Sequence, residues 1–162
     1  TKNKRVGVIG TVGTIDSGIH ASYLKKLDPD ITVIGKACPL FVPLVEEGWL
    51  HDPVTMEVTA RYLQEFKDKN VDTLILGCTH YPLLRGVIGR EMGESVKLVN
   101  PAYETAKSLK DLLKEKDLLN VSGEKPEHKF FVSDGVDQFR SFANSILPYQ
   151  VENTTVVDIE SY

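Results

Sequence analysis

The sequence has few of the features that mark extracellular, metal-binding or membrane proteins. Only two cysteines, Cys38 and Cys78, occur among its 162 residues. Two cysteines do not make a disulfide framework, which favours a reducing compartment and predicts a cytoplasmic protein. No CxxC or HExxH spacing is present, so a structural metal is not expected. No apolar run approaches the roughly 20 residues of a membrane span, and no signal-peptide hydrophobic region precedes the first expected strand.

The sequence also lacks an excess of positive charge and the usual nucleotide motifs. Nineteen basic and 23 acidic residues give a net charge of −4, with no basic block, so nucleic acid and anionic membranes are not expected partners. The segment GTVG at residues 10–13 is neither GxGxxG nor a P-loop. Thr11, Thr14 and Ser17 near it fit a plain capped turn best and a turn that holds a small anion next, both better than a cofactor site, so no cofactor is predicted.

Short apolar runs alternate with segments of helical periodicity along the whole chain. This order predicts an α/β fold with a parallel sheet and helices on both faces. We expect strands at residues 5–10, 31–34, 71–76, 96–99, 129–133 and 155–159. We expect helices at residues 17–27, 39–48, 53–67, 82–92, 101–113 and 136–147. The first helix would present Ile19, Tyr23, Leu24 and Leu27 on one face. The third would present Met56, Ala60, Leu63 and Phe66 or Lys67. Residues 120–127 form the best linker candidate.

The segment GCTHYP at residues 77–82 is the best candidate for chemistry. It follows a buried strand and precedes a proline that favours a helix start, at the strand end where α/β sheets bind ligands. The thiolate is the reactive form of Cys78, and a helix N-terminus favours negative charge. The Thr79 hydroxyl and free backbone N–H groups suit a substrate carboxylate, and His80 suits proton transfer. From these residues alone, an unreactive buried thiol is an equally good interpretation.

A second candidate residue, Glu46, ends the segment CPLFVPLVE at residues 38–46. Pro39 would begin a short helix that buries Phe41, Leu44 and Val45. Because acidic side chains are almost never buried without a partner, the residues alone favour a solvated Glu46 over one that faces a site.

These motifs, together with GVIGT at residues 7–11 and the strand FVSD at residues 131–134, resemble the glutamate racemases of the aspartate/glutamate racemase superfamily. The resemblance covers nearly the whole chain. It implies cofactor-independent conversion of L-glutamate to D-glutamate by two thiols, for peptidoglycan and cell-wall synthesis in a bacterial cytoplasm. It also implies that Cys78 is one of the two thiols, that Thr79 and His80 contact glutamate, that His80 assists Cys78, and that Glu46 orients His80.

The sequence departs from that family at one point. The motif that carries the other catalytic cysteine in these racemases lies in an N-terminal segment and is not found, and the family does not use the position of Cys38 catalytically. The resemblance therefore predicts the C-terminal portion of a racemase, with one complete lobe at residues 1–101 and part of a second at residues 102–162. We expect this portion to be inactive alone. We expect its exposed Phe130, Phe131, Phe139 and Phe142 to require a second copy or the missing segment.

Three other functions compete with this interpretation. The first is a related enzyme, an aspartate or hydantoin racemase or a single-cysteine decarboxylase. The second is a hydrolase with a Cys-His nucleophile, which would form a covalent acyl-thiol intermediate. The third is a non-enzymatic module that binds glutamate even without the Cys78 thiol.

Overall fold

The computed structural model describes residues 1–161, which divide into two units. The first unit is Thr1–Leu118, and the second begins at Leu119. This division falls after helix α6 (Pro101–Glu115), not at the boundary expected between residues 101 and 102. The boundary between racemase lobes stays a prediction, and the two units are described separately below.

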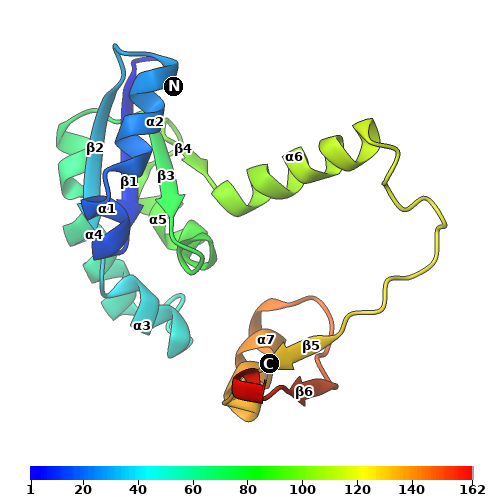
Figure 1. Cartoon of the computed structure of the whole chain (residues 1–162). Helices are drawn as coiled ribbons and strands as arrows, with labels where there is room; N and C mark the ends of the chain where they lie inside the picture. The colour runs from blue at the N-terminus through cyan, green and yellow to red at the C-terminus, as the bar shows by residue number, and fades with distance from the viewer. Residues whose placement is uncertain (162) are drawn as a thin grey trace. The chain divides into compact units, whose positions relative to one another are not determined.

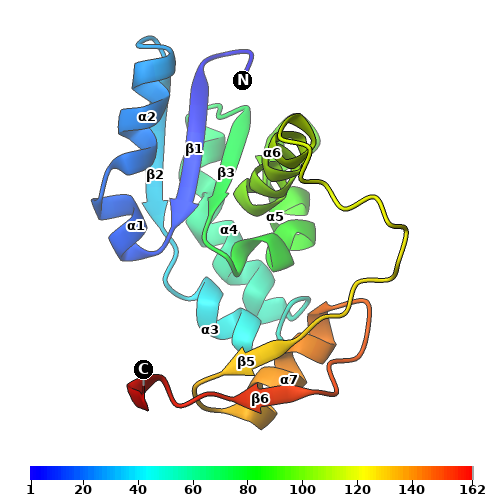
Figure 2. The same ribbon diagram turned by 45° about the vertical axis from the view of Figure 1, so that its right-hand side comes forward.

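The first unit is built on a parallel sheet of four strands, as predicted. The strands are β1 (Arg5–Gly10), β2 (Thr32–Ala37), β3 (Thr73–Gly77) and β4 (Lys97–Val99). Their order across the sheet is β2-β1-β3-β4 (Figure 1). The register pairs Gly10 with both Ala37 and Gly77, so the carboxyl ends of the three longer strands finish at the same level. The short helix α3 (Phe41–Glu46) lies beyond these ends (Figure 2).

Helices α4 (Pro53–Asp68) and α5 (Arg85–Met92) cover one face of the sheet, where most of the core lies. Leu63 and Phe66 of α4 are fully buried, as the helical pattern predicted. The predicted Met56 and Ala60 are only half-buried, and the neighbouring Thr55 and Thr59 take the most buried positions instead. Burial of these threonines is possible because their hydroxyls donate to the carbonyls of Trp49 and Thr55, at 2.6 and 2.7 Å.

The helix expected at residues 17–27 begins two residues later than predicted. Two helices, α1 (Val12–Asp16) and α2 (Ile19–Leu27), lie on the other side of the sheet, and Gly18 with φ of 62° separates them (Figure 2). A residue with positive φ interrupts a right-handed helix, and glycine adopts it without strain. The apolar stripe of α2 is not core: Ile19, Tyr23 and Leu27 are 52%, 62% and 81% exposed.

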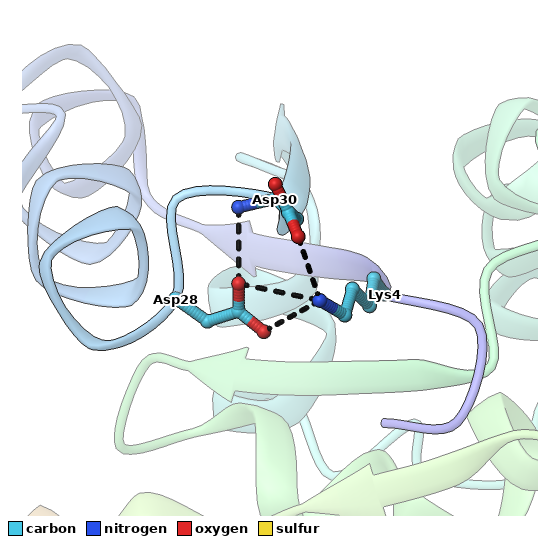
Figure 3. A network of polar contacts seen from close by, with 3 residues as sticks. All are labelled: Lys4, Asp28 and Asp30. Carbon is cyan, nitrogen blue, oxygen red and sulfur yellow. Dashed lines mark hydrogen bonds and ion pairs between the residues drawn. The ribbon is translucent and has the colours of Figure 1, made fainter.

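An exposed ion-pair cluster joins the start of β1 to the turn between α2 and β2 (Figure 3). The Lys4 ammonium lies 3.1 Å from an Asp28 oxygen and 3.0 Å from an Asp30 oxygen. The Asp28 carboxylate also accepts from the Asp30 backbone N–H at 3.0 Å. The hydrogen bond from Lys4 is the main reason that the pKa of Asp28 lies below its ordinary value. The cluster lies at the amino ends of the strands, away from the predicted site.

The remaining helices of the first unit are α6 and the 3-10 helix η1 (Tyr81–Leu84). Helix α6 begins where predicted, because the Asn100 side chain accepts from the backbone N–H groups of Ala102 and Tyr103. It has no buried residue. In the described residues, 1–161, no helix is both long and apolar enough to cross a lipid bilayer.

The second unit contains helix α7 (Val136–Ile146), two short parallel strands, β5 (Phe130–Val132) and β6 (Thr154–Val156), and the 3-10 helix η2 (Ile159–Ser161). The last strand ends earlier than predicted. The expectation of four exposed phenylalanines was only partly right: Phe131 is 61% exposed, but Phe130, Phe139 and Phe142 are half-buried. The rings of Phe130 and Phe139 pack with their centroids 5.9 Å apart. The predicted linker, residues 120–127, contains no helix or strand.

Candidate active site

The turn that carries Cys78 lies where the strand order changes direction. The chain passes from β1 outward to β2 and then returns to β3 on the other side of β1. In open α/β sheets the carboxyl ends at such a switch point are where ligands bind. Cys78 comes directly after Gly77, the last residue of β3, and is half-buried. A Cβ atom at position 77 would lie 2.8 Å from the Ile9 carbonyl oxygen, so only glycine allows β3 to end this close to β1.

The helix after this turn differs from the prediction. The chain forms η1 first, and the α-helix α5 starts only at Arg85. Two of the backbone N–H groups that were expected to be free are used within the turn. The Tyr81 N–H donates to the Cys78 carbonyl at 3.2 Å, and the Leu83 N–H donates to the His80 carbonyl at 3.0 Å. These two N–H groups are therefore not available to a carboxylate.

His80 contacts a polar partner with each ring nitrogen. Its Nε2 lies 3.3 Å from Oε1 of Glu46, and its Nδ1 lies 3.2 Å from Oγ1 of Thr79. In the neutral imidazole with its proton on Nε2, this N–H donates to the Glu46 carboxylate and the Thr79 hydroxyl donates to Nδ1. In the imidazolium, both ring nitrogens donate. The His80 side chain is 26% exposed and that of Glu46 is 56% exposed. The structure thus brings together Cys78, Thr79, His80 and Glu46, the predicted site residues, while their roles stay predictions.

The exposure of Glu46 reconciles the two interpretations of that residue. It is solvated, as the residues alone favoured, and it also contacts His80, as the resemblance implied. Helix α3 makes both possible, because Phe41 and Val45 bury its inner face and Glu46 comes at its last position.

Cys38, the other thiol, lies in an environment that suppresses its reactivity. It is fully buried, and its Sγ contacts the Lys36 carbonyl oxygen at 3.7 Å. Burial raises the pKa of Cys38 to about 12, despite an opposing effect of the Lys36 charge. Because the thiolate is the reactive form, Cys38 is unsuited to proton transfer near neutral pH.

The glycine- and threonine-rich segment after β1 is a capped turn. Thr11 is the N-cap of α1 and accepts from the Thr14 N–H at 3.3 Å, while the two hydroxyls lie 2.9 Å apart. The Ser17 hydroxyl donates to the Thr14 carbonyl at 2.8 Å. In the part of the chain that the structure describes, no three His, Cys, Asp or Glu side chains group so that they could hold a metal ion.

The arrangement of the first unit agrees with the comparisons with known proteins. Residues 1–109 match the family described as Asp/Glu/Hydantoin racemase, which is about two thirds of the chain. The chain belongs to this racemase family. Among curated relatives, the glutamate racemase of Thermoanaerobacter sp. (strain X514) is 46% identical, over the whole of this chain and 61% of its own length. The glutamate racemase of Geobacter metallireducens is 44% identical, over 99% of this chain and 60% of its own length.

Solved racemase structures have the same fold. Glutamate racemase isoform RacE1 from Bacillus anthracis superposes with a TM-score of 0.90 at 38% identity, over 98% of this chain and 59% of that one. Glutamate racemase from Francisella tularensis, solved in complex with D-glutamate, gives 0.88 at the same identity and the same coverage. The chain therefore spans about three fifths of the length of these relatives.

Two further residues lie beside the site: the sequence predicted burial of Phe41 but no contact for it, and it gave no role to Tyr81. The Tyr81 hydroxyl donates to the Cys38 carbonyl at 2.8 Å, and the Phe41 ring packs edge-on against Tyr81 with centroids 5.2 Å apart. The only signal for them was the apolar character of their segments, which cannot show a contact between residues so far apart in sequence.

Proposed function

We propose that the protein containing this chain interconverts L- and D-glutamate without a cofactor, and that Cys78 is one of its two proton-transferring thiols. The observation that carries the proposal is the turn at the switch point, where a half-buried thiol is followed by an imidazole that contacts a carboxylate. Glutamate is the proposed substrate because the similar relatives are named glutamate racemases, and one solved relative holds D-glutamate.

In the proposed reaction, the Cys78 thiolate removes the α-proton of one enantiomer and becomes a thiol. A second thiol, on the opposite face of the substrate, gives its proton to the α-carbon and becomes a thiolate. No proton is gained or lost overall, and the α-carbon is inverted because the two protons move on opposite faces. His80, held by Glu46, assists Cys78, and the Thr79 hydroxyl contacts the substrate.

In this proposal the second thiol comes from outside this chain. Cys38 is the only other cysteine, and its burial and raised pKa make it unsuitable. We therefore expect the chain alone not to racemise glutamate. Residues 1–101 would form one lobe of the enzyme and residues 102–162 part of the other, completed by the rest of the protein or by association with another chain. The D-glutamate would serve peptidoglycan synthesis in the cytoplasm.

The test uses a fusion of this chain to the part of the Thermoanaerobacter relative that lies outside the match. In D2O we expect the fusion to racemise glutamate and to exchange its α-proton, measured by circular dichroism and proton NMR. Cys78→Ala should slow both racemisation and α-proton exchange by at least about 100-fold. Cys38→Ala is the matched control and is expected to keep activity. A folded fusion that leaves the α-proton unexchanged, or a Cys78→Ala variant with an unchanged rate, would overturn the proposal.

The same fusion separates two of the competing functions from racemisation. A hydrolase would accumulate an acyl-thiol adduct on Cys78, which mass spectrometry detects and which racemisation does not produce. A binding module would bind glutamate in the Cys78→Ala variant and would exchange no proton in either protein.

A further inference from the structure

Helix α3, which carries Glu46, leaves the sheet from β2, whereas His80 and Cys78 follow β3. The two strands are not neighbours, because β1 lies between them. The contact between Glu46 and His80 therefore depends on something that fixes α3 against the turn. The contact itself does not do so, because both side chains are solvent-accessible and such ion pairs are weak.

Tyr81 makes the buried contacts that join these two segments. Its side chain is fully buried, and its hydroxyl donates to the Cys38 carbonyl, three residues before α3 begins, at 2.8 Å. Its ring meets the Phe41 ring, at the start of α3, nearly perpendicularly at an interplanar angle of 88°. Such edge-to-face pairs stabilise beyond the area that they bury.

The phenol acts as a donor in this contact at any physiological pH. Burial raises the pKa of Tyr81, and the thiols of Cys38 and Cys78 add to the effect, so that the hydroxyl stays protonated. The backbone N–H of Tyr81 meanwhile donates to the Cys78 carbonyl at 3.2 Å. One residue is thus bonded to the turn of Cys78 through its main chain and to the segment before α3 through its side chain.

We propose that Tyr81 is a positioning residue that holds α3, and with it Glu46, against His80 in the Cys78 turn. Its meaning for catalysis rests on the function proposed above, but the placement of Glu46 can be measured without any activity. Tyr81 touches neither substrate nor the reacting atoms; it acts through Glu46. Removing its hydroxyl should therefore have the same effect on His80 as neutralising Glu46.

The test compares Tyr81→Phe, Glu46→Gln and the double variant in the 162-residue chain, by NMR of the His80 ring. We expect the ring signals to move in the same direction in both single variants, and Glu46→Gln to move them less once Tyr81→Phe is present. Tyr62→Phe is the matched control. Its ring also lies edge-on to Phe41, at 5.3 Å, but its hydroxyl accepts from the Leu40 N–H, which belongs to the segment before α3 and not to the Cys78 turn. His80 signals in this control should stay in place.

A merely structural role for Tyr81 gives a different result. Tyr81→Phe would then lower the free energy of unfolding while the His80 ring signals stay unchanged, and this outcome would overturn the proposal. Should Tyr81→Phe fail to fold, Phe41→Leu provides a second variant, which removes the edge-to-face contact with Tyr81 together with the one to Tyr62. His80 signals that stay unchanged in folded Phe41→Leu, while they move in Glu46→Gln, would equally overturn the proposal. In the active fusion, Tyr81→Phe should lower kcat by roughly two- to five-fold with little change in KM. If the fusion is active but Tyr81→Phe leaves the His80 ring signals unchanged, only the role of Tyr81 is refuted. If the His80 signals move as expected but the fusion is inactive, only the proposed racemase function is refuted.

Discussion

The two cysteines should differ in alkylation rate by several orders of magnitude in the folded chain. The folded chain is treated with iodoacetamide, which alkylates thiolates, at pH 8. Burial raises the pKa of Cys38 to about 12, so about one Cys38 thiol in ten thousand is ionised at that pH. An ordinary cysteine in an unfolded chain is about one quarter ionised under the same conditions. The low ionised fraction alone therefore slows alkylation of Cys38 by about three orders of magnitude relative to a cysteine in an unfolded chain. The full burial of its side chain slows alkylation further.

Cys78 is half-buried in the turn after β3 and should react from the folded state. The assay is peptide mapping by mass spectrometry of samples taken over time, with the chain kept folded according to circular dichroism. In concentrated urea both peptides should label at similar rates, which provides the internal control. Labelling of Cys38 at a rate close to that of Cys78, in a chain that is still folded, would refute the inference that burial makes Cys38 the unreactive thiol.

Two further predictions concern stability. Burial opposes ionisation of Asp72, but hydrogen bonds from the Thr1 hydroxyl and nearby backbone N–H groups outweigh it and hold the pKa of Asp72 well below its ordinary value. Because the folded-state pKa is lowered, the stabilisation is present at neutral pH and is lost as the pH falls through that pKa. Asp72→Asn should cost about 1 kcal/mol in urea unfolding at pH 7 and less at pH 3, and an equal loss at both would contradict this. Gly77→Ala should cost about 1–3 kcal/mol, because its Cβ would lie 2.8 Å from the Ile9 carbonyl oxygen, whereas Gly13→Ala, with open space at Cβ, should not destabilise.

The parts of the fold that the sequence predicted are those that local residues determine. Strand β1 has the predicted bounds, since an apolar β-branched run ends at Gly10. The turn after β3 was predicted because Gly77 and Pro82 both mark its ends. The start of α6 was predicted from Asn100 and Pro101, which form a local cap.

The parts that were missed depend on contacts distant in sequence. The pattern of α2 correctly predicted a helix with an apolar stripe, but no pattern tells whether another element covers that stripe, and here none of its residues is buried. In α4 the buried row shifted to Thr55 and Thr59, because carbonyls nearby accept from their hydroxyls. A polar residue gives no hint of such an acceptor in the pattern of hydropathy.

The order of the strands explains why the site itself was harder to predict than its residues. Cys78 and His80 were found because they follow a recognisable strand, and Glu46 was found only through the resemblance. Their contact requires that β2 and β3 flank β1 and end at the same level, so that the segments after them meet beyond the end of β1. The sequence of β1 does not predict which strands pair with it, because parallel strands pair through backbone N–H and C=O groups that nearly all residues share. The most specific contact between these two segments is the hydrogen bond from the Tyr81 hydroxyl to the Cys38 carbonyl, 43 residues away in the sequence. The Tyr81→Phe experiment thus tests a relation between two segments that depends on the topology of the sheet.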